Sequence, residues 1–336
     1  MAAKFSGGTR AVYRGVLFPG MTSRFPIIVG PTAGGKSALA VEVARVLAAA
    51  GRHAEIISAD SVHIFRGMDI GSAKPTPEER GGNVHHLIDI CDPAGPPFTV
   101  HDWLAEANRL IDSLRAQGVV PIVVGGTHLY IKSLLEGMFD GPGADEALRD
   151  ELRGVGLPGL RAELERIDPA AARRIHPNDE RRTIRAIEVY RLTGRAISEH
   201  QAQWDREDRV RRDAVLVGLE WGIEEINRRI NARVRTMIEQ GLVGEVRSLH
   251  AAGRLGTQAR EALGYKQIVD HLEGRCTLDE AVEAIKIETR RFGKNQRTWL
   301  RRLKRTPASL WIDAQHVPRE LWAGLVVRAM DESPGE

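Results

Sequence analysis

Eight consecutive residues near the start of the chain have the types and spacing of a phosphate-binding loop. They are Gly30, Pro31, Thr32, Ala33, Gly34, Gly35, Lys36 and Ser37. The glycines let consecutive backbone N–H groups turn toward an anion, and a helix that begins here adds its unpaired N–H groups. The Lys36 ammonium would reach phosphate oxygens, and the Ser37 hydroxyl would ligate Mg²⁺. The loop therefore predicts binding of a diphosphate, but it does not identify the molecule that carries it.

Short apolar runs alternate with helical patterns around this loop. Strands are predicted at 25–29, 55–58, 85–90, 119–124 and 214–219, and helices from Ser37, at 102–114 and at 127–135. This alternation predicts an α/β fold of the P-loop, nucleoside-triphosphate-hydrolase-like kind, with a parallel sheet and helices on both faces. Ligands of such sheets bind at the carboxyl ends of the strands. The phosphate loop, Asp60-Ser61 and Gly125-Gly126-Thr127 all follow predicted strands, so we expect them to lie close together.

The pattern changes after Gly141, where helices are predicted at 145–153, 160–167, 169–175 and 180–192 with no intervening strand. We interpret 141–205 as a helical insertion into a core formed by 25–140 and 206–315. Further helices are expected at 223–240, 243–252 and 278–303. Residues 1–24 carry no signal-peptide pattern and are expected to be a disordered extension, with Met21 as an alternative start. Residues 316–336 are expected to be a C-terminal tail.

The composition is that of an ordinary globular protein, with 42% hydrophobic and 28% charged residues and a net charge of +3. No apolar run approaches a membrane span. Cys91 and Cys276 lack metal-ligand spacing, which favours inert thiols in a reducing compartment, and we expect a cytoplasmic monomer. Nine Lys and Arg against one acid lie between Lys286 and Arg305, with Phe292 and Trp299 among them. This stretch is either a solvated helix face with two core aromatics or a track for a polyanion such as RNA.

Several motifs together carry a resemblance to a known family. They are the phosphate loop, Asp60-Ser61, the stretch Gly67-Met68-Asp69-Ile70-Gly71-Ser72-Ala73-Lys74-Pro75, Gly125-Gly126-Thr127-His128-Leu129-Tyr130, His176-Pro177-Asn178-Asp179 through Glu188, and Leu263-Gly264-Tyr265-Lys266-Gln267. In order and spacing, from about residue 25 to about residue 305, the chain resembles the bacterial-type tRNA dimethylallyltransferases, also called tRNA isopentenyltransferases. The Asp-Ile-Gly-Ser-Ala-Lys-Pro stretch is far more specific than the phosphate loop alone.

The resemblance implies transfer of a dimethylallyl group from dimethylallyl diphosphate to the exocyclic amine of an adenosine. That adenosine lies immediately 3′ of the anticodon in tRNAs that read codons beginning with U, and it must leave its stack to react. The adenine amine is a poor nucleophile, so a base must take its proton, and Asp60 at a strand end can do so. Lys36, the loop N–H groups and Mg²⁺ on Ser37 would stabilise the leaving diphosphate. The resemblance adds Arg233, whose fork suits a phosphate.

The resemblance also implies a set of tRNA contacts. They are Asp60, Ser61, Val62, His63, Thr127, Arg149, Arg181, Arg182, Thr183, Ile184, Arg185, Glu261, Ala262, Leu263, Gly264, Tyr265 and Lys266. The chain departs from the family where His63 and Arg181 replace Gln, Phe65 replaces Tyr, and Asn295 and Glu261 replace basic residues. These departures affect the tRNA contacts and leave the reaction unchanged.

Structural alternatives remain for these residues. Asp60 could be a capping carboxylate, Arg233 could pair with Glu225 or Glu239, and Arg149, Arg182 and Arg185 could be solvated surface cations. Three other functions also remain: prenylation of free adenine nucleotides, phosphotransfer with Asp89 or Asp60 on the Mg²⁺ side, and RNA binding without catalysis. The helical insertion and the basic stretch disfavour a small acceptor. Intact Lys36, Ser37 and Asp60 disfavour a non-catalytic module.

Overall fold

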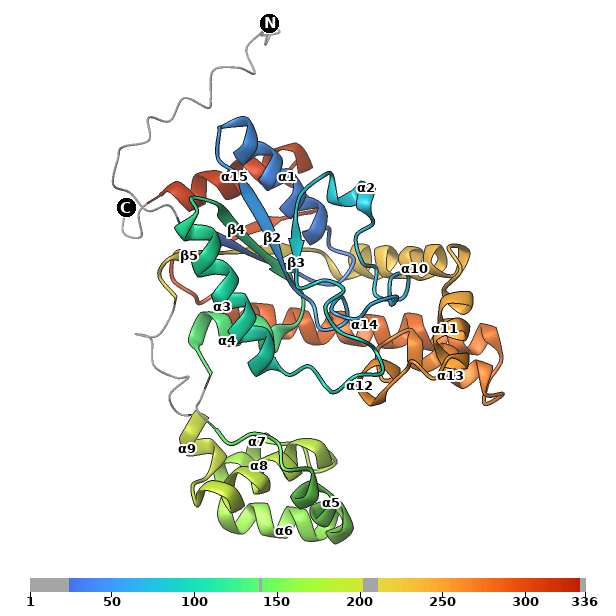
Figure 1. Ribbon diagram of the computed structural model, residues 1–336. Coiled ribbons are helices and arrows are strands. Elements are labelled where there is room, and N and C mark those ends of the chain that lie inside the picture. The colour runs from blue at the N-terminus through green and yellow to red at the C-terminus, as the bar shows by residue number, and fades with distance from the viewer. Residues whose placement is uncertain (1–23, 139–140, 202–210, 333–336) are drawn as a thin grey trace, which may run out of the picture. The chain divides into compact units, whose positions relative to one another are not determined.

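A computed structural model describes residues 24–138, 141–201 and 211–332 of the protein (Figure 1). The chain divides into two compact units, Met1–Lys132 with Arg211–Glu336, and Ser133–Val210. We call the first the core unit and the second the helical unit. The predicted insertion, 141–205, falls inside the helical unit. Of the predicted N-terminal extension, only Arg24 lies within the described residues. It is buried and donates to the Ala329 carbonyl at 2.6 Å, so Arg24 itself is part of the folded core unit.

The described residues of the core unit contain one six-stranded parallel sheet with the order β3-β2-β4-β1-β5-β6. The strands are β1 (Phe25–Val29), β2 (Ala54–Ala59), β3 (His85–His86), β4 (Val120–Gly125), β5 (Ala214–Glu220) and β6 (Leu310–Asp313). Every residue of the central strand β1 is buried, as expected where helices cover both faces of a parallel sheet. The predicted α/β fold is confirmed, and β6 is an additional strand that the sequence did not reveal.

Helices cover both faces of the sheet. The helices of the core unit are α1 (Lys36–Ala49), α2 (Pro77–Arg80), α3 (Val100–Ala116), α4 (His128–Glu136), α10 (Ile223–Glu239), α11 (Leu242–Ala251), α12 (Thr257–Arg260), α13 (Tyr265–Leu272), α14 (Leu278–Leu303) and α15 (Arg319–Asp331). Helices α1 and α15 lie together on one face, and α3 lies on the other (Figure 1). The long helix α14 passes the carboxyl edge of the sheet, so it can contact the loops that follow the strands.

The prediction of a C-terminal tail over 316–336 was wrong for most of that segment. Residues Arg319–Asp331 form α15, which buries Trp322, Val326 and Met330 in the same apolar cluster as α1 and the sheet. Without this helix, part of the apolar surface of α1 would face water. The apolar spacing of Trp322, Val326 and Met330 is the signal that the sequence analysis passed over.

The third strand is shorter than the predicted 85–90. Leu87 and Asp89 both have positive φ, 59° and 58°, which ends the extended backbone after two residues. The Asp89 N–H then donates to the His63 carbonyl at 3.0 Å. The turn brings the Asp89 side chain to Lys74, whose role is described below.

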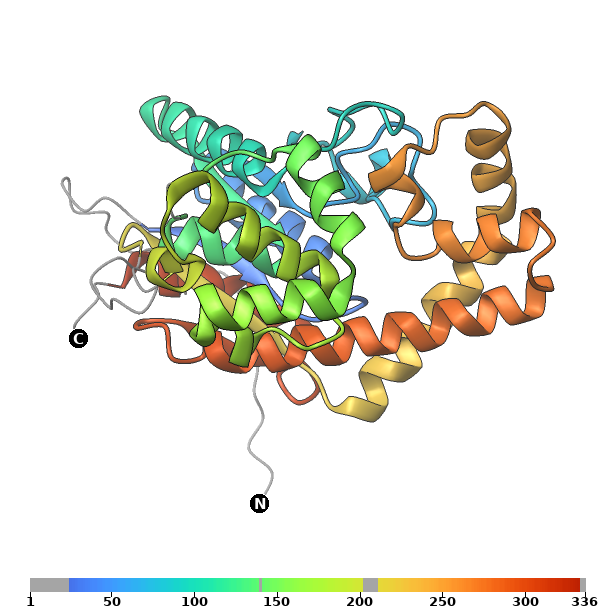
Figure 2. The ribbon, with the colours of Figure 1, turned by 90° about the horizontal axis from the view of Figure 1, so that it is seen from below.

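Helices α10 to α14 build a second apolar cluster beside the sheet. Its buried members come from α10, α11, α12, α13, the first half of α14 and the segment around Phe65 and Met68. Helices α10 and α14 pack across each other, and both extend away from the sheet (Figures 1 and 2). This cluster fixes the loop that follows β2 against α11 and α13.

The helical unit contains only helices in its described residues. They are α5 (Glu146–Val155), α6 (Leu157–Ile167), α7 (Pro169–Arg174), α8 (Glu180–Thr193) and α9 (Ile197–Gln201), around an apolar cluster that includes Leu152, Leu164 and Ile187. The buried Asp168 caps α7 through the Ala171 N–H at 2.9 Å and accepts from the Ser198 hydroxyl at 2.7 Å. Asp179 caps α8 by accepting from the Arg182 N–H at 3.0 Å.

Candidate active site

The phosphate loop links β1 to α1 through two left-handed residues. Ala33 has φ 60° and Gly35 has φ 89°, and the Gly34 N–H donates to the Pro31 carbonyl at 3.1 Å. A Cβ on Gly34 would lie 2.8 Å from that carbonyl oxygen, so the turn requires glycine there. Gly35 is the N-cap of α1, and no side chain caps the helix. The N–H groups of its first turn are thus suited to an anion.

Lys36 reaches back over the loop to the Pro31 carbonyl, 2.9 Å from Nζ. Burial, and then the nearby Arg233 cation, lower the pKa of Lys36 to about 8, and Asp60 acts in the opposite direction. The two charged neighbours bring three of the predicted catalytic residues into one electrostatic environment. The fourth, Ser37, is exposed on the first turn of α1, where its hydroxyl could hold Mg²⁺ beside a bound diphosphate.

Asp60 follows β2 and is partly exposed. Its Oδ1 accepts from the Val62 N–H at 2.9 Å, so the carboxylate also holds the turn that begins here. The capping alternative is therefore part of its role. Next to it, the Thr127 hydroxyl accepts from the Ser61 N–H at 3.0 Å and contacts the Ser61 hydroxyl at 3.3 Å. The ends of β2 and β4 are joined in this way, and Asp60, Ser61 and Thr127 lie together as predicted.

Glycine at the end of β4 permits this approach. A Cβ on Gly125 would overlap the Ala59 carbonyl, and the Thr127 N–H donates to that same carbonyl at 3.2 Å. The indole of Trp103 on α3 holds the neighbouring Ser58 carbonyl at 2.9 Å and stacks on Tyr130, with ring centroids 4.6 Å apart. These contacts fix the carboxyl edge on which Asp60 stands.

Two arginines of α10 flank the phosphate loop. The Arg229 Nε donates to the Ala33 carbonyl at 2.9 Å, and its guanidinium lies 4.5 Å above the ring of Trp221, whose indole holds the Gly34 carbonyl at 3.0 Å. Arg233, one turn later, is surrounded by protein yet more than a third exposed. Desolvation and then the Arg229 cation lower its pKa, whereas Glu79 and Asp60 raise it. Arg229 was missed from sequence, although its spacing from Arg233 places both on one face.

The sequence also allowed an ion pair between Arg233 and either Glu225 or Glu239. Glu225 pairs with Arg228 on the same helix, and the charges that act on the pKa of Arg233 are those of Arg229, Glu79 and Asp60. Arg233 therefore faces the phosphate-loop side of the molecule. This environment suits a cation that binds a phosphate better than it suits a cation already paired with a surface acid.

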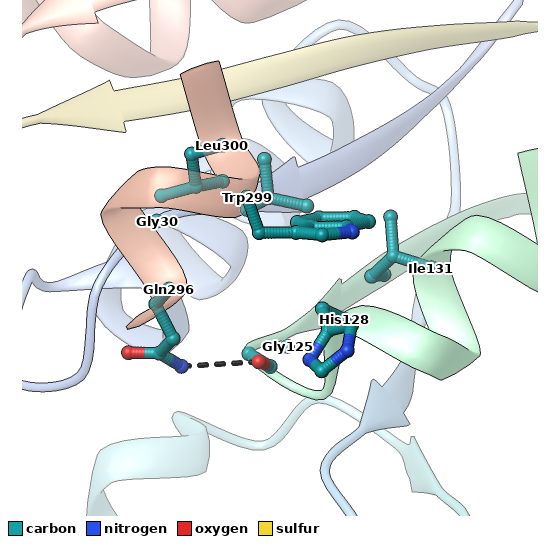
Figure 3. A pocket seen from close by; sticks show the side chains of 9 residues that line it. Gly30, Gly125, His128, Ile131, Gln296, Trp299 and Leu300 are labelled. Carbon is teal, nitrogen blue, oxygen red and sulfur yellow. Dashed lines mark hydrogen bonds between the residues drawn. The ribbon is translucent and has the colours of Figure 1, made fainter. Parts of the chain in front are cut away.

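Gln296 of α14 completes the loop's surroundings. Its Oε1 accepts from the Thr32 N–H at 2.8 Å, and its Nε2 donates to the Gly126 carbonyl at 3.0 Å (Figure 3). A cavity of about 10 Å³, enough for roughly one water, lies beside it. His128 and Trp299 face each other across this cavity with ring centroids 5.4 Å apart. Gln296 was also missed from sequence, because nothing in a helical pattern marks a buried amide.

The Asp-Ile-Gly-Ser-Ala-Lys-Pro stretch is anchored by one carboxylate. Glu245 of α11 accepts from the N–H groups of Asp69, Ile70 and Gly71 at 3.0, 2.8 and 3.1 Å, and from the Tyr265 hydroxyl at 2.6 Å. A Cβ on Gly71 would lie 2.5 Å from the Tyr265 ring. Desolvation and the Glu245 carboxylate raise the pKa of Tyr265, which remains a hydrogen-bond donor. The glycine and the tyrosine of two separate motifs thus fit one another.

Lys74 closes the same stretch. Its side chain is 2% exposed, and Nζ donates to the Phe65 carbonyl at 2.7 Å, to Asp69 at 2.6 Å and to Asp89 at 2.5 Å. Asp89 is consequently engaged by a lysine instead of facing the phosphate loop. This arrangement disfavours Asp89 as the Mg²⁺-side carboxylate of a phosphotransferase.

Comparisons with known proteins agree with the motifs. A family model described as IPP transferase matches residues 63–303. A tRNA dimethylallyltransferase 2 from Geotalea uraniireducens is 45% identical over 278 residues, which cover 81% of this chain and 87% of the relative. The corresponding enzyme from Geobacter sulfurreducens is 43% identical over 88% of this chain and 93% of its own length.

The chain belongs to the tRNA dimethylallyltransferase family.

Solved structures agree with this assignment. The full-length tRNA isopentenylpyrophosphate transferase of Bacillus halodurans matches with a TM-score of 0.66 and 37% identity, over 92% of this chain and 97% of that one. A eukaryotic dimethylallyltransferase captured while acting on tRNA matches with a TM-score of 0.73 and 26% identity, over 87% and 74% of the two chains. The family resemblance drawn from the motifs is confirmed.

Within this family member, several residues assigned to tRNA in the core unit have buried side chains. The His63 ring is 9% exposed, with Nδ1 3.3 Å from the Ser58 hydroxyl and Nε2 3.2 Å from the Ser72 carbonyl. Phe65 lies in the cluster beside the sheet. His63 and Phe65 therefore differ from the family at positions that are packed inside the protein. They affect a contact to RNA less directly than the sequence suggested.

The segment 261–266 divides in the same way. Ala262, Gly264 and Tyr265 are buried, whereas Glu261 and Lys266 are exposed and pair at 2.7 Å. Leu263 is half-buried. Lys266 and Glu261 are the members of this segment whose charged groups can meet a ligand from outside.

In the helical unit, two of the predicted tRNA-binding arginines surround a buried acid. Glu188 is 0% exposed. Its carboxylate accepts hydrogen bonds from Arg149 Nε at 2.9 Å, from Arg185 Nη1 at 2.5 Å and from the Asp145 N–H at 2.8 Å. Although burial opposes it, these bonds hold the pKa of Glu188 below its usual value. Arg185 also donates to the Pro142 carbonyl at 2.8 Å. Arg149 and Arg185 hold the helical unit together and are not merely solvated cations.

The other residues of the predicted tRNA-binding segment 181–185 are partly exposed and partly buried. Thr183 and Ile184 are buried, and the Thr183 hydroxyl bonds back to the Asp179 carbonyl at 2.8 Å. Arg181 and Arg182 are exposed, and Arg182 lies 3.4 Å from Asp179. Arg181 and Arg182 are accordingly the cations of this run that a nucleic acid could reach.

The basic stretch of α14 is mixed. Arg290 donates to Asn231 at 2.7 Å, and Lys304 pairs with Glu220 at 2.6 Å, whereas Lys294 and Arg301 are exposed. Phe292 is 43% exposed, so it is not the core aromatic that one interpretation expected.

Among residues 24–138, 141–201 and 211–332, no helix has the length and hydropathy of a membrane span.

Proposed function

We propose that this protein transfers the dimethylallyl group of dimethylallyl diphosphate to the exocyclic N6 amine of the adenosine immediately 3′ of the anticodon, in tRNAs that read codons beginning with U. Diphosphate is released. The observation that carries the proposal is the shared environment of Lys36, Arg233 and Asp60 beside the phosphate loop. Two cations and one carboxylate are what a diphosphate leaving group and a weak nucleophile require.

The diphosphate would lie on the loop N–H groups and the first turn of α1. Lys36 and Arg233 would neutralise the charge that builds on it as the C–O bond breaks. Mg²⁺ would be held by the Ser37 hydroxyl, since Mg²⁺ takes few protein ligands when phosphate oxygens complete its shell, and it would supply further charge to the leaving group. Arg229 and Trp221 would keep the loop carbonyls of Ala33 and Gly34 turned away from the anion.

Asp60 would act as the general base. In the reaction, the N6 atom forms a bond to the dimethylallyl C1 while the C1–O bond to diphosphate breaks, and one N6 proton passes to the Asp60 carboxylate. Because Oδ1 is oriented by the Val62 N–H, the carboxylate has a fixed direction at the edge of the sheet. Ser61 and Thr127, which are bonded to one another, lie next to it and would contact the entering nucleoside.

The macromolecular acceptor is supported by exposed cations in both units. Arg181 and Arg182 of the helical unit, and Lys294 and Arg301 of α14, are exposed and suit an RNA backbone. A relative that acts on tRNA shares the fold over most of its length. A free nucleotide would need neither set. We expect the protein to act as a monomer, which sedimentation at the assay concentration can check.

The decisive experiment compares acceptors with one radiolabelled donor. Purified protein, Mg²⁺ and labelled dimethylallyl diphosphate are incubated with unmodified tRNA or with AMP, and the nucleosides are separated after digestion. We expect label in N6-dimethylallyl adenosine from tRNA and none in AMP. Label in AMP at a comparable rate would contradict the tRNA proposal, and tRNA-dependent hydrolysis of ATP without prenyl transfer would contradict the donor.

A further inference from the structure

Gln296 lies on a helix that is distant in sequence from the phosphate loop, and it is 5% exposed. Its amide accepts a hydrogen bond from the Thr32 N–H and donates one to the Gly126 carbonyl, the second of which Figure 3 shows. Both partners are backbone groups at the carboxyl edge of the sheet, one after β1 and one after β4. The amide therefore joins the two loops that flank the proposed diphosphate site.

The hydrogen bond to the Thr32 N–H also orients the Pro31 carbonyl. The Thr32 N–H and the Pro31 C=O belong to one peptide unit, and in a trans peptide they point in opposite directions. When Gln296 draws the N–H toward α14, the Pro31 carbonyl turns the other way. That carbonyl accepts from Lys36 Nζ at 2.9 Å and from the Gly34 N–H at 3.1 Å. The orientation of this single peptide determines whether Lys36 has its acceptor.

We propose that Gln296 is a positioning residue for diphosphate binding: by fixing the Pro31–Thr32 peptide, it holds the Lys36 ammonium over the phosphate loop. The inference rests on the proposed function only in taking Lys36 as a diphosphate ligand. Both ends of the Gln296 amide hold backbone groups of the flanking loops, so its proposed role is to position Lys36.

The chemistry of the site accounts for the residue type. One partner is a donor and the other an acceptor, so the side chain must offer both, and a carboxamide does. A carboxylate of the same shape would accept from Thr32 but would set an oxygen against the Gly126 carbonyl. It would also add negative charge beside an anion site. A lysine or arginine would have no acceptor for the Thr32 N–H.

Gly126 is shaped for the same contact. A Cβ added there would lie 2.6 Å from Gln296 Nε2 and 3.6 Å from Lys36 Nζ. The second glycine of Gly125-Gly126 thus leaves room for the amide, whereas the first leaves room for the Ala59 carbonyl. Lys36 and Gln296 are close neighbours of one backbone position, as the proposal requires.

A double-mutant cycle tests the proposal, with inorganic pyrophosphate and Mg²⁺ as the probe and calorimetry as the measurement. The variants are Gln296→Leu, Lys36→Ala and their combination in the full chain. Loss of the loop bond should weaken pyrophosphate binding about tenfold in the wild-type background. In the Lys36→Ala background, the same change should weaken binding by less than about twofold, because the group that it positions is gone.

Equal effects in the two backgrounds would overturn the proposal, as would an absence of pyrophosphate binding by the wild-type chain. Thr298→Ala, an exposed position on the same helix, is the control and should bind normally. If Gln296→Leu does not fold, Gln296→Glu replaces it, and it should lose at least as much affinity with an unchanged far-UV spectrum. Since pyrophosphate carries no prenyl group, a failure of the proposed prenyl transfer would leave this result intact and distinguishable.

Discussion

Cations of the phosphate-loop edge and cations of the helical unit have opposite surroundings. The pKa values of Lys36 and Arg233 are both lowered, first by desolvation and then by a nearby cation, which is Arg233 for Lys36 and Arg229 for Arg233. Arg149 and Arg185 enclose the buried carboxylate of Glu188, and its hydrogen bonds raise the pKa of Arg149 despite desolvation. The cations beside the phosphate loop lack a fully compensating negative charge. Those of the helical unit are already paired with Glu188.

The difference separates a binding site from a structural network. A cation whose charge is destabilised by its surroundings gains most when an anion arrives, whereas a cation already bonded to a buried acid gains little and loses stability if it is disturbed. Four arginines of similar appearance in the sequence, 149, 181, 182 and 185, thus divide into two that support the helical unit and two that face outward. Substitutions at each kind should fail in different ways.

The largest effect is expected at Asp60. Asp60→Asn keeps the size and the bond to the Val62 N–H but removes the basic oxygen, and loss of a general base costs roughly 10²–10⁴-fold in rate. Single-turnover prenylation at saturating tRNA and donor isolates this step from binding and release. Pyrophosphate binding should change far less. A variant within about threefold of wild type would show that another group or water takes the proton.

The next effect sharpens the contrast from the structural side. Arg185→Glu would set a second carboxylate against the buried Glu188, and breaking such a buried pair costs about 3–5 kcal/mol. We expect the helical unit to melt early and to be cut by protease, whereas pyrophosphate binding by the core unit is retained. Proteolysis followed by mass spectrometry locates the loss. Normal resistance within residues 141–201 would mean that the Glu188 network is dispensable.

Much of this contrast could not be read from the sequence. The phosphate loop, the parallel sheet and the edge that carries Asp60, Ser61 and Thr127 follow from local patterns, because strand, turn and helix signals lie within a few residues of one another. The family motifs also indicated Gly71 and Tyr265, but not that the Tyr265 ring leaves no room for a Cβ at residue 71. Such fits join segments almost two hundred residues apart, and no local periodicity encodes them.

The failures have the same origin. Gln296, Arg229 and Glu245 act on the loops through side-chain hydrogen bonds from helices whose patterns describe only burial. His63 and Arg185 have the types that bind RNA, yet their polar groups are used within the protein. The tail assigned to 316–336 conceals a core helix because its stripe is short and lies after a strand that was itself missed.

A pH experiment tests whether the loop cation is as poorly compensated as its surroundings suggest. The pKa of Lys36 is about 8, with Arg233 from α10 and Asp60 after β2 as the charged groups that act on it. Below that pH the ammonium attracts an anion, and above it the attraction fades, so one unit above the pKa the pyrophosphate affinity should be about tenfold lower than well below the pKa. The Lys36→Ala variant reports the titration of pyrophosphate itself. Identical pH profiles for the two proteins would mean that Lys36 stays charged throughout.

The smallest effect is expected at the outward cations, and it completes the comparison. Arg181→Glu with Arg182→Glu changes two exposed side chains of α8 and leaves the Glu188 network and the apolar cluster untouched. If these arginines neutralise RNA phosphates, tRNA affinity should fall several-fold at low salt, and the slope of log affinity against log salt should become shallower by about one for each lost contact. The melting temperature and pyrophosphate affinity should match the wild type, in contrast to Arg185→Glu on the same helix. Filter binding of unmodified tRNA from low to moderate salt measures both quantities. An unchanged affinity and slope would remove α8 from the RNA-binding surface and leave the exposed cations of α14, such as Lys294 and Arg301, as the next positions to reverse.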